Sequence, residues 1–214
     1  MRFAASRGTS DKPAAKDGPL ALTRHSSGFE QFCSILQSSE NLSILDMSGA
    51  SQANVTFITE FGHRISSDDI IGTMMECFGS DFLESQQAAS NAQRFLDQTL
   101  KFPDATFDGA LVWDALQFLT SPLLDQTVAQ LLRVMRPGGP MLVFFNSDEK
   151  ATRIPVYNYR IQDTKNLLQI PRTRAGSQRT QFFNNRSIEK VFQNAASLKF
   201  FLTRDHLREV IVRR

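Results

Sequence analysis

Two acidic residues at strand ends could belong to the binding site of a nucleotide-like cofactor. Asp46 follows a short apolar run at residues 42–45, and Asp69 follows a second, more polar run at residues 63–67. A loop of small residues (47–52) and a stretch of apolar residues at helical spacing lie between the two runs. This order of strand, loop, helix, strand and acid is typical of the first βαβ unit of a dinucleotide-type fold, in which the acid accepts hydrogen bonds from ribose hydroxyls. The pattern therefore predicts a cofactor site at the ends of two strands.

A second strand–helix–strand unit spans residues 107–145. An apolar strand pattern at 107–113 is followed by Asp114, and an amphipathic helix pattern with apolar residues between 123 and 135 comes next. Pro137-Gly-Gly-Pro140 ends the helix before a buried strand pattern. Two such crossover units predict a parallel sheet with helices on both faces.

The edges of this sheet are expected to differ. Residues 79–89 contain no strand-like run, which leaves open that the sheet lacks its third strand. Near the C-terminus, the weakly alternating runs 198–202 and 210–212 predict an antiparallel hairpin, and residues 188–192 predict a short helix before it. The fold class is α/β, with a doubly wound, mostly parallel sheet completed by this hairpin.

Three stretches of the chain resemble the class I S-adenosylmethionine (SAM) methyltransferases. Ile44-Leu45-Asp46, with Gly62 and Asp69, has the family's spacing from loop to ribose-binding acid. Residues 100–111, LKFPDATFDGAL, resemble the family's "LPFPDGSFDxV", and residues 131–143 resemble its "LxRVLKPGG" turn into the fifth strand. The resemblance implies a Rossmann-like fold, SAM as cofactor, and methyl transfer to an oxygen or nitrogen of a small molecule.

The resemblance also assigns places to individual residues. Asp46 would brace the loop or contact the amino group of SAM, the loop would wrap the methionine portion, and Asp69, with Asp68 as the alternative, would accept from the ribose hydroxyls. The cofactor-binding candidates are Asp46, Ser48, Gly49, Ala50, Ser51, Asn54, Asp68, Asp69 and Trp113.

The loop departs from the family pattern at its three glycine places. These hold Ser48, Ala50 and Gln52, and the one loop glycine, Gly49, sits between the usual places. If the backbone there must take a positive φ, alanine or serine costs on the order of 1–2 kcal/mol. Gln52 could bind the SAM carboxylate or fill the site. The family's adenine-binding acid is also not found, so a second hypothesis is a methyltransferase fold that has lost SAM and serves as a binding or scaffolding module.

Each candidate also has a structural interpretation. Asp46 could brace the loop, and Asp69 and Asp114 could cap the helices that follow them. Trp113 could be a core residue, or line the pocket beyond its strand. Methyl transfer needs a base only when the acceptor must lose a proton, and Asp114 or His206 is the candidate for that role. A histidine in a solvated turn is the alternative for His206.

The remaining features limit the class of protein. A formal net charge of +2 is too small to indicate a nucleic-acid partner, and no apolar run approaches the length of a membrane helix. Cys33 and Cys77 form no CxxC motif, and the three histidines have no metal-ligand spacing, which predicts buried thiols, a reducing cytoplasm and no metal. We expect a disordered tail at 1–20 and a single domain at 21–214. The expected partner is a small-molecule substrate or, under the second hypothesis, a protein.

The segment after the sheet is where the family often builds its substrate lid. It contains the chain's two tyrosines, Tyr157 and Tyr159, which are candidate substrate contacts. Several basic residues also gather there and could favour an anionic substrate if the segment covers the site.

Overall fold

The computed structural model describes residues 20–201, 203 and 206–214. The tail expected at residues 1–20 therefore lies outside the described residues, apart from Leu20.

A six-stranded sheet forms the centre of the molecule, in the order β10-β11-β5-β4-β2-β3. The neighbours among β2, β3, β4 and β5 pair in parallel, whereas β11 pairs antiparallel with both β5 and β10. This confirms the predicted α/β fold, with its mostly parallel sheet and C-terminal antiparallel hairpin. The strands are β2 (Ser43–Asp46), β3 (Arg64–Ser67), β4 (Gly109–Trp113), β5 (Pro140–Asn146), β10 (Ser197–Phe201) and β11 (Leu207–Arg213).

The sequence left open whether the sheet has its third strand, and this strand is absent. All the regular structure between β3 and β4 is helical, so β3 is the edge strand of the central sheet. The helices in this interval are α3 (Ile70–Phe78), α4 (Phe82–Ser85) and α5 (Ala89–Gln98). They bury apolar side chains such as Met74, Phe78 and Phe95 in the larger of the two cores.

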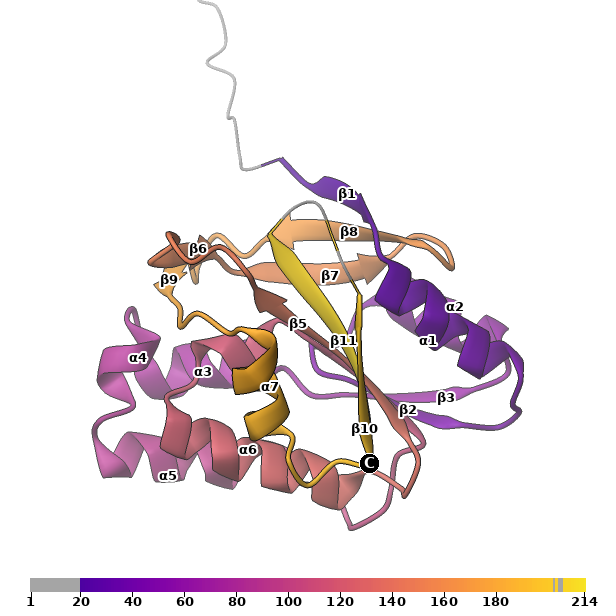
Figure 1. The fold of residues 1–214 in the computed structure, drawn as a ribbon, viewed down its shortest axis with the longest axis horizontal. Coiled ribbons are helices and arrows are strands. Elements are labelled where there is room, and N and C mark those ends of the chain that lie inside the picture. The colour runs from indigo at the N-terminus through magenta and orange to yellow at the C-terminus, as the bar shows by residue number, and fades with distance from the viewer. Residues whose placement is uncertain (1–19, 202, 204–205) are drawn as a thin grey trace, which may run out of the picture.

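Helices cover both faces of the central sheet (Figure 1). On one face, α1 (Ser27–Gln37) and α2 (Gln52–Glu60) pack on a core that includes Ile44, Leu111 and Phe144. The other face carries α3, α5, α6 (Ser121–Val134) and α7 (Asn185–Val191), and a short 3-10 helix, η1 (Ala115–Phe118), follows β4. Alternate residues of β4 and β5 thus supply both cores, as expected for strands that are buried on both sides.

Helices α1 and α7 begin at side-chain N-caps. Ser26 is the N-cap of α1, because it has an extended backbone and its hydroxyl accepts from the amide of Phe29 at 3.0 Å. Asn184 is the N-cap of α7, and its side chain accepts from the amide of Ser187 at 2.8 Å.

A second, three-stranded antiparallel sheet lies across the carboxyl ends of the central strands (Figure 1). Its order is β1 (Leu22–His25), β8 (Asn166–Pro171) and β7 (Tyr157–Ile161), and we call it the cap sheet. A small pair, β6 (Arg153–Pro155) with β9 (Ser177–Arg179), lies beside it. The sequence did not predict β1, whose pattern is polar and largely exposed.

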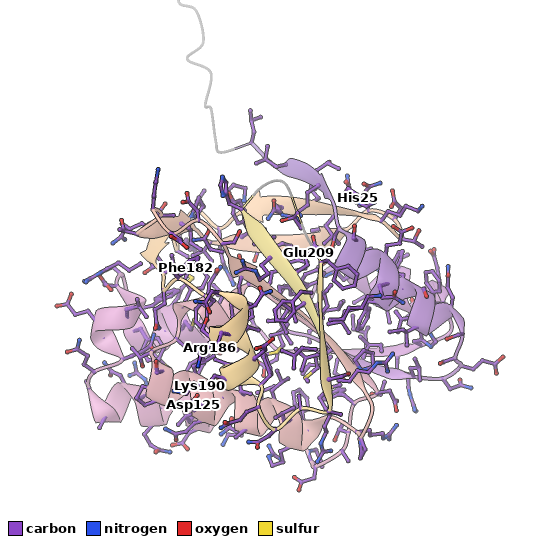
Figure 2. The ribbon with its side chains drawn as sticks, viewed as in Figure 1. His25, Asp125, Phe182, Arg186, Lys190 and Glu209 are labelled. Atoms are coloured by element: carbon purple, nitrogen blue, oxygen red, sulfur yellow. The ribbon has the colours of Figure 1, made fainter. Side chains whose placement is uncertain are left out.

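A buried carboxylate joins the cap sheet to the central sheet. Glu209 of β11, labelled in Figure 2, is fully buried. It accepts from the Arg24 guanidinium at 2.7 Å, the Ser26 hydroxyl at 2.9 Å and the Gly28 amide at 2.6 Å. The amide belongs to the first turn of α1, where an anion is favoured by the helix dipole. Glu209 therefore fixes the start of α1 and the Arg24 side chain.

Candidate active site

Asp46, at the end of β2, is fully buried and its carboxylate is saturated by groups of the chain itself. Oδ1 accepts from the amide and hydroxyl of Ser48, at 3.0 and 2.8 Å, and from the indole nitrogen of Trp113 at 2.8 Å. Oδ2 accepts from Asn54 Nδ2 at 2.6 Å. Asp46 therefore braces the loop, which is one of the two roles predicted for it.

The loop after β2 lies directly against the residues after β3. Ser48 forms an antiparallel β-bridge with Asp69, and the Gly49 amide donates to the carbonyl of Asp68 at 3.2 Å. Gly49 has a φ of +80°, and a Cβ placed on it would lie 3.2 Å from Cβ of Asp69. Glycine is therefore needed at this position for both its backbone conformation and its close approach to Asp69.

The other loop residues face outward or begin α2. Ala50 is exposed, and Ser51 is the N-cap of α2, accepting from the amide of Asn54 at 3.2 Å. Gln52 is exposed and donates to Thr56 at 3.0 Å, one helical turn along. Gln52 thus neither fills the loop nor points into it.

Asn54 ties the start of α2 to the cap sheet. Besides donating to Asp46, its Nδ2 donates to the carbonyl of Tyr159 at 3.2 Å, and its Oδ1 accepts from the amide of Ile161 at 2.9 Å. The side chain is fully buried. A single asparagine therefore fixes β7 over the loop, a role that the sequence did not reveal.

Trp113 is both a core residue and a wall of the site. It has a φ of +59° beside an irregularity in the pairing of β4 with β5, which turns its indole nitrogen toward Asp46. Its ring stacks on Tyr159, with parallel planes and centroids 4.9 Å apart. Tyr159 is fully buried, so the two rings form a wall next to Asp46.

Asp69 has the role of helix cap and also forms an ion pair. Oδ1 accepts from the amide of Gly72 at 2.9 Å and from Nη1 of Arg172 at 2.7 Å, and Oδ2 accepts from Nη2 of Arg172. Partial burial raises the pKa of Asp69, but the hydrogen bonds from Arg172 and Gly72 outweigh it and the net pKa is lowered. A second guanidinium, that of Arg160, lies close enough for the charges of Asp46 and Asp69 to oppose the lowering of its pKa by burial.

Asp68, the alternative ribose acid, is used elsewhere. Its Oδ2 accepts from the amide of Leu100 at 2.8 Å, which fastens the segment before β4 to the end of β3. Burial raises the pKa of Asp68, which is the direction expected for a carboxyl without a cationic partner.

Asp114 lies in a cavity of about 300 Å³ beneath the cap sheet, at the carboxyl ends of β4 and β5. The carboxyl is almost completely buried, and burial raises its pKa to about 7, although a hydrogen bond from the Tyr159 hydroxyl opposes the shift. Asp114 does not cap η1 with its side chain. The walls of the cavity are Leu22, Arg24, Asp114, Gln117, Asn146, Ile154, Pro155, Tyr157, Tyr159, Gln169, His206 and Leu207.

Both predicted base candidates, Asp114 and His206, therefore line one cavity, together with the two tyrosines. The sequence missed Gln117, which is fully buried. Its Oε1 accepts from the amide of Asn146 at 2.7 Å, and within the described residues its Nε2 has no hydrogen-bond partner. An unpaired buried amide donor at the end of a parallel strand is a feature that binding sites tolerate and cores avoid. No sequence signal distinguishes Gln117 from a residue of a surface helix.

Residues 45–143 match the family model described as "Methyltransferase domain". This stretch runs from β2 through β5, and so contains Asp46, Asp69 and Asp114. Over residues 45–143 the chain is therefore similar to the SAM-dependent methyltransferases, the family that the sequence resembles. The cofactor of such a domain is SAM. A search of curated proteins finds no match.

Solved structures of low sequence identity have a similar arrangement. One is the 1,6-didemethyltoxoflavin-N1-methyltransferase of Burkholderia thailandensis, with 14% identity, coverage of 87% of this chain and 76% of that chain, and a TM-score of 0.45. The PH0226 protein of Pyrococcus horikoshii has 13% identity, coverage of 87% and 89%, and a TM-score of 0.49. A SAM-dependent methyltransferase of Methanosarcina mazei has 13% identity, coverage of 81% and 92%, and a TM-score of 0.48.

The donor set at the ends of β2 and β3 fits SAM in its chemistry. Asp46 and Asp69 are carboxylates suited to an ammonium group and to ribose hydroxyls, and the loop offers amides and small side chains. In the described conformation, however, these atoms are bonded to Ser48, Asn54, Trp113 and Arg172. Neither the cavity around Asp114 nor the one beside Asp69 is lined by loop residues 47–51.

Other classes of site find no support in the described part of the chain. It contains no group of three or more His, Cys, Asp and Glu side chains placed to hold a metal ion. Both cysteines are buried free thiols, as predicted. None of its helices is long and apolar enough to cross a membrane.

Proposed function

We propose that this protein transfers the methyl group of SAM to an oxygen or nitrogen atom of a small molecule bound in the cavity around Asp114. The observation that carries the proposal is a buried carboxyl, with a pKa raised to about 7, on the wall of a cavity that shares Tyr159 with the aromatic pair next to Asp46. A pKa near the working pH suits a general base, since the group is then available as a carboxylate and still holds a proton well.

Two polar wall residues, Asp114 and Gln117, have roles in this proposal. Asp114 accepts the proton that the acceptor atom loses, and Gln117 Nε2 donates to an oxygen or nitrogen of the acceptor and so orients it. When bound, SAM supplies an activated methyl group, so alignment is the main task of the protein. The volume of about 300 Å³ suits a molecule of one or two rings.

The test uses SAM with a tritiated methyl group and a panel of phenols, catechols and heteroaromatic N–H compounds. Wild-type protein should label at least one compound, and the rate should rise with pH through about 7 as Asp114 ionises. Asp114→Asn should lower that rate by about a hundredfold or more. Asp125→Asn, at an exposed carboxyl of α6, is the matched control. An accepted compound that Asp114→Asn methylates at the wild-type rate would contradict the role of Asp114.

The self-bonded loop supports a second candidate function. A methyltransferase fold whose acids are satisfied internally could be a binding or scaffolding module with a protein partner. Calorimetric titration with SAM and S-adenosylhomocysteine separates the two candidates. Binding at micromolar concentrations, near −8 kcal/mol, would support the methyltransferase. No heat up to millimolar ligand, with no shift in melting temperature, would favour the module.

A further inference from the structure

Asp69, the predicted ribose acid, is paired with a residue from a distant segment of the chain. Asp69 follows β3, whereas Arg172 follows β8 directly, yet the two side chains meet in a two-point ion pair. A guanidinium presents two parallel N–H donors to a carboxylate. Those two donors occupy the acceptor sites that the two hydroxyls of a ribose would use.

The hairpin formed by β7 and β8 also contacts the residues that bind Asp46, the other predicted cofactor acid. Asn54, which donates to Asp46, is also bonded to the backbone of β7 at Tyr159 and Ile161. The Tyr159 ring adds a stacking contact with Trp113, the indole donor to Asp46. β7 and β8 pair along their length. The hydrogen bonds with Asn54 and the ion pair with Asp69 are therefore made by one hairpin and the residue that directly follows it.

The ion pair between Asp69 and Arg172 leaves open space beside it. A cavity of about 450 Å³ remains on the outer side of the ion pair, lined by Asp69, Gly72, Glu76, Asn158 and Arg172 among others. Asp69 is partly exposed, at 41% of its side chain, and Arg172 at 20%. The ion pair is therefore accessible to solvent, and its Coulomb energy is moderated enough for a ligand to compete.

We propose that the β7–β8 hairpin is an internal occupant of the cofactor cleft, and that Arg172 sets the affinity for SAM by competing with the ribose for Asp69. This inference rests on the proposed function. The described conformation is then the cofactor-free form. SAM binds only to the fraction of molecules in which Arg172 has left Asp69 and β7 has left Asn54, and its apparent dissociation constant is the intrinsic one divided by that fraction.

Removing the arginine should therefore tighten binding, which is the opposite of what loss of a ligand contact does. Calorimetric titrations with SAM and with S-adenosylhomocysteine would compare wild type, Arg172→Ala and Arg186→Ala. We expect Arg172→Ala to bind both ligands at least tenfold more tightly than wild type. Arg186 is an exposed arginine of α7 that lines neither of the two cavities described above, so Arg186→Ala should stay within twofold.

A second readout follows the hairpin itself. The amide of Ile161, which donates to Asn54, should exchange with deuterium faster when S-adenosylhomocysteine is bound, and faster in Arg172→Ala without ligand. Arg172→Gln, which keeps most of the side-chain length without the charge, should show the same direction. It serves as the check if Arg172→Ala has a lowered melting temperature.

The outcomes separate this proposal from the proposed function. Micromolar binding by wild type that Arg172→Ala leaves unchanged or weakens would overturn the internal competition and leave the methyltransferase standing. Weakened binding would assign Arg172 to the cofactor carboxylate instead. Absence of binding by all variants up to millimolar ligand would overturn both.

Discussion

Raising the pH from 5 to 8 should destabilise the folded protein through Asp114. In the unfolded chain this carboxyl ionises near 3.8, whereas burial raises its pKa to about 7 in the folded protein. Between these values the unfolded chain has released the proton that the folded chain still holds. Stability must therefore fall as the pH rises, and level off above pH 7.

The size of this effect follows from the shift. At 1.36 kcal/mol per pKa unit, a rise from 3.8 to about 7 corresponds to about 4 kcal/mol, and about 3 kcal/mol of it falls between pH 5 and pH 8. Asp114→Asn removes the titrating group and keeps an acceptor oxygen for the Tyr159 hydroxyl. The stability of the variant relative to wild type should therefore improve by about 3 kcal/mol between the two pH values.

Urea unfolding of both proteins at pH 5 and pH 8 measures this quantity. The quantity of interest is the free energy of unfolding of Asp114→Asn minus that of wild type, compared between the two pH values. The contributions of the other carboxyls are the same in both proteins, and the effect of the amide is the same at both pH values, so both cancel. Asp125→Asn, on the outer surface of α6 (Figure 2), should show a difference that changes by less than about 0.5 kcal/mol. A difference for Asp114→Asn that is constant with pH, or that moves the other way, would refute the buried, proton-holding carboxyl and with it the proposed base.

Two further predictions concern stability. Glu209→Gln removes the buried carboxylate that pairs with Arg24 and should cost about 3–5 kcal/mol in chemical unfolding. Glu30→Gln, at a solvent-exposed ion pair, should cost less than about 1 kcal/mol, and equal costs would contradict the role of burial. Gly49→Ala should cost more than Gly62→Ala, because both have positive φ but only Gly49 has side-chain atoms within 4 Å of the added Cβ, and thermal unfolding that ranks them in the other order would contradict the tight loop.

The central sheet was predictable because its signals are local. The apolar runs at β2, β4 and β5, the glycine–proline turn before β5 and the alternating runs of the C-terminal hairpin each appear within a few residues. The missing third strand was visible for the same reason, since residues 79–89 have no strand pattern. Asp69 as a helix cap also follows from its place one residue before a helical pattern.

The sequence did not predict β1, because its four residues have almost no strand pattern. Its sequence, Leu-Thr-Arg-His, is mostly exposed, and it becomes a strand only because β8 offers it an edge. The sequence missed Gln117 for a related reason. An amide in a short helical turn is ordinary in sequence, and only the packing of β4 and β5 buries its nitrogen without a partner.

The sequence by itself determined the α/β fold, its mostly parallel sheet and the positions of Asp46, Asp69 and Asp114 at strand ends, because periodicity and turn residues act over a few residues. Only the tertiary structure decided what those acids do. Arg172 reaches Asp69 across 103 positions, and Asn54 reaches Ile161 across 107. The pKa of Asp114 depends on the cap sheet that buries it. Pairings over such separations, and the loss of water around a carboxyl, arise from the packing of whole elements and leave no trace in the local pattern.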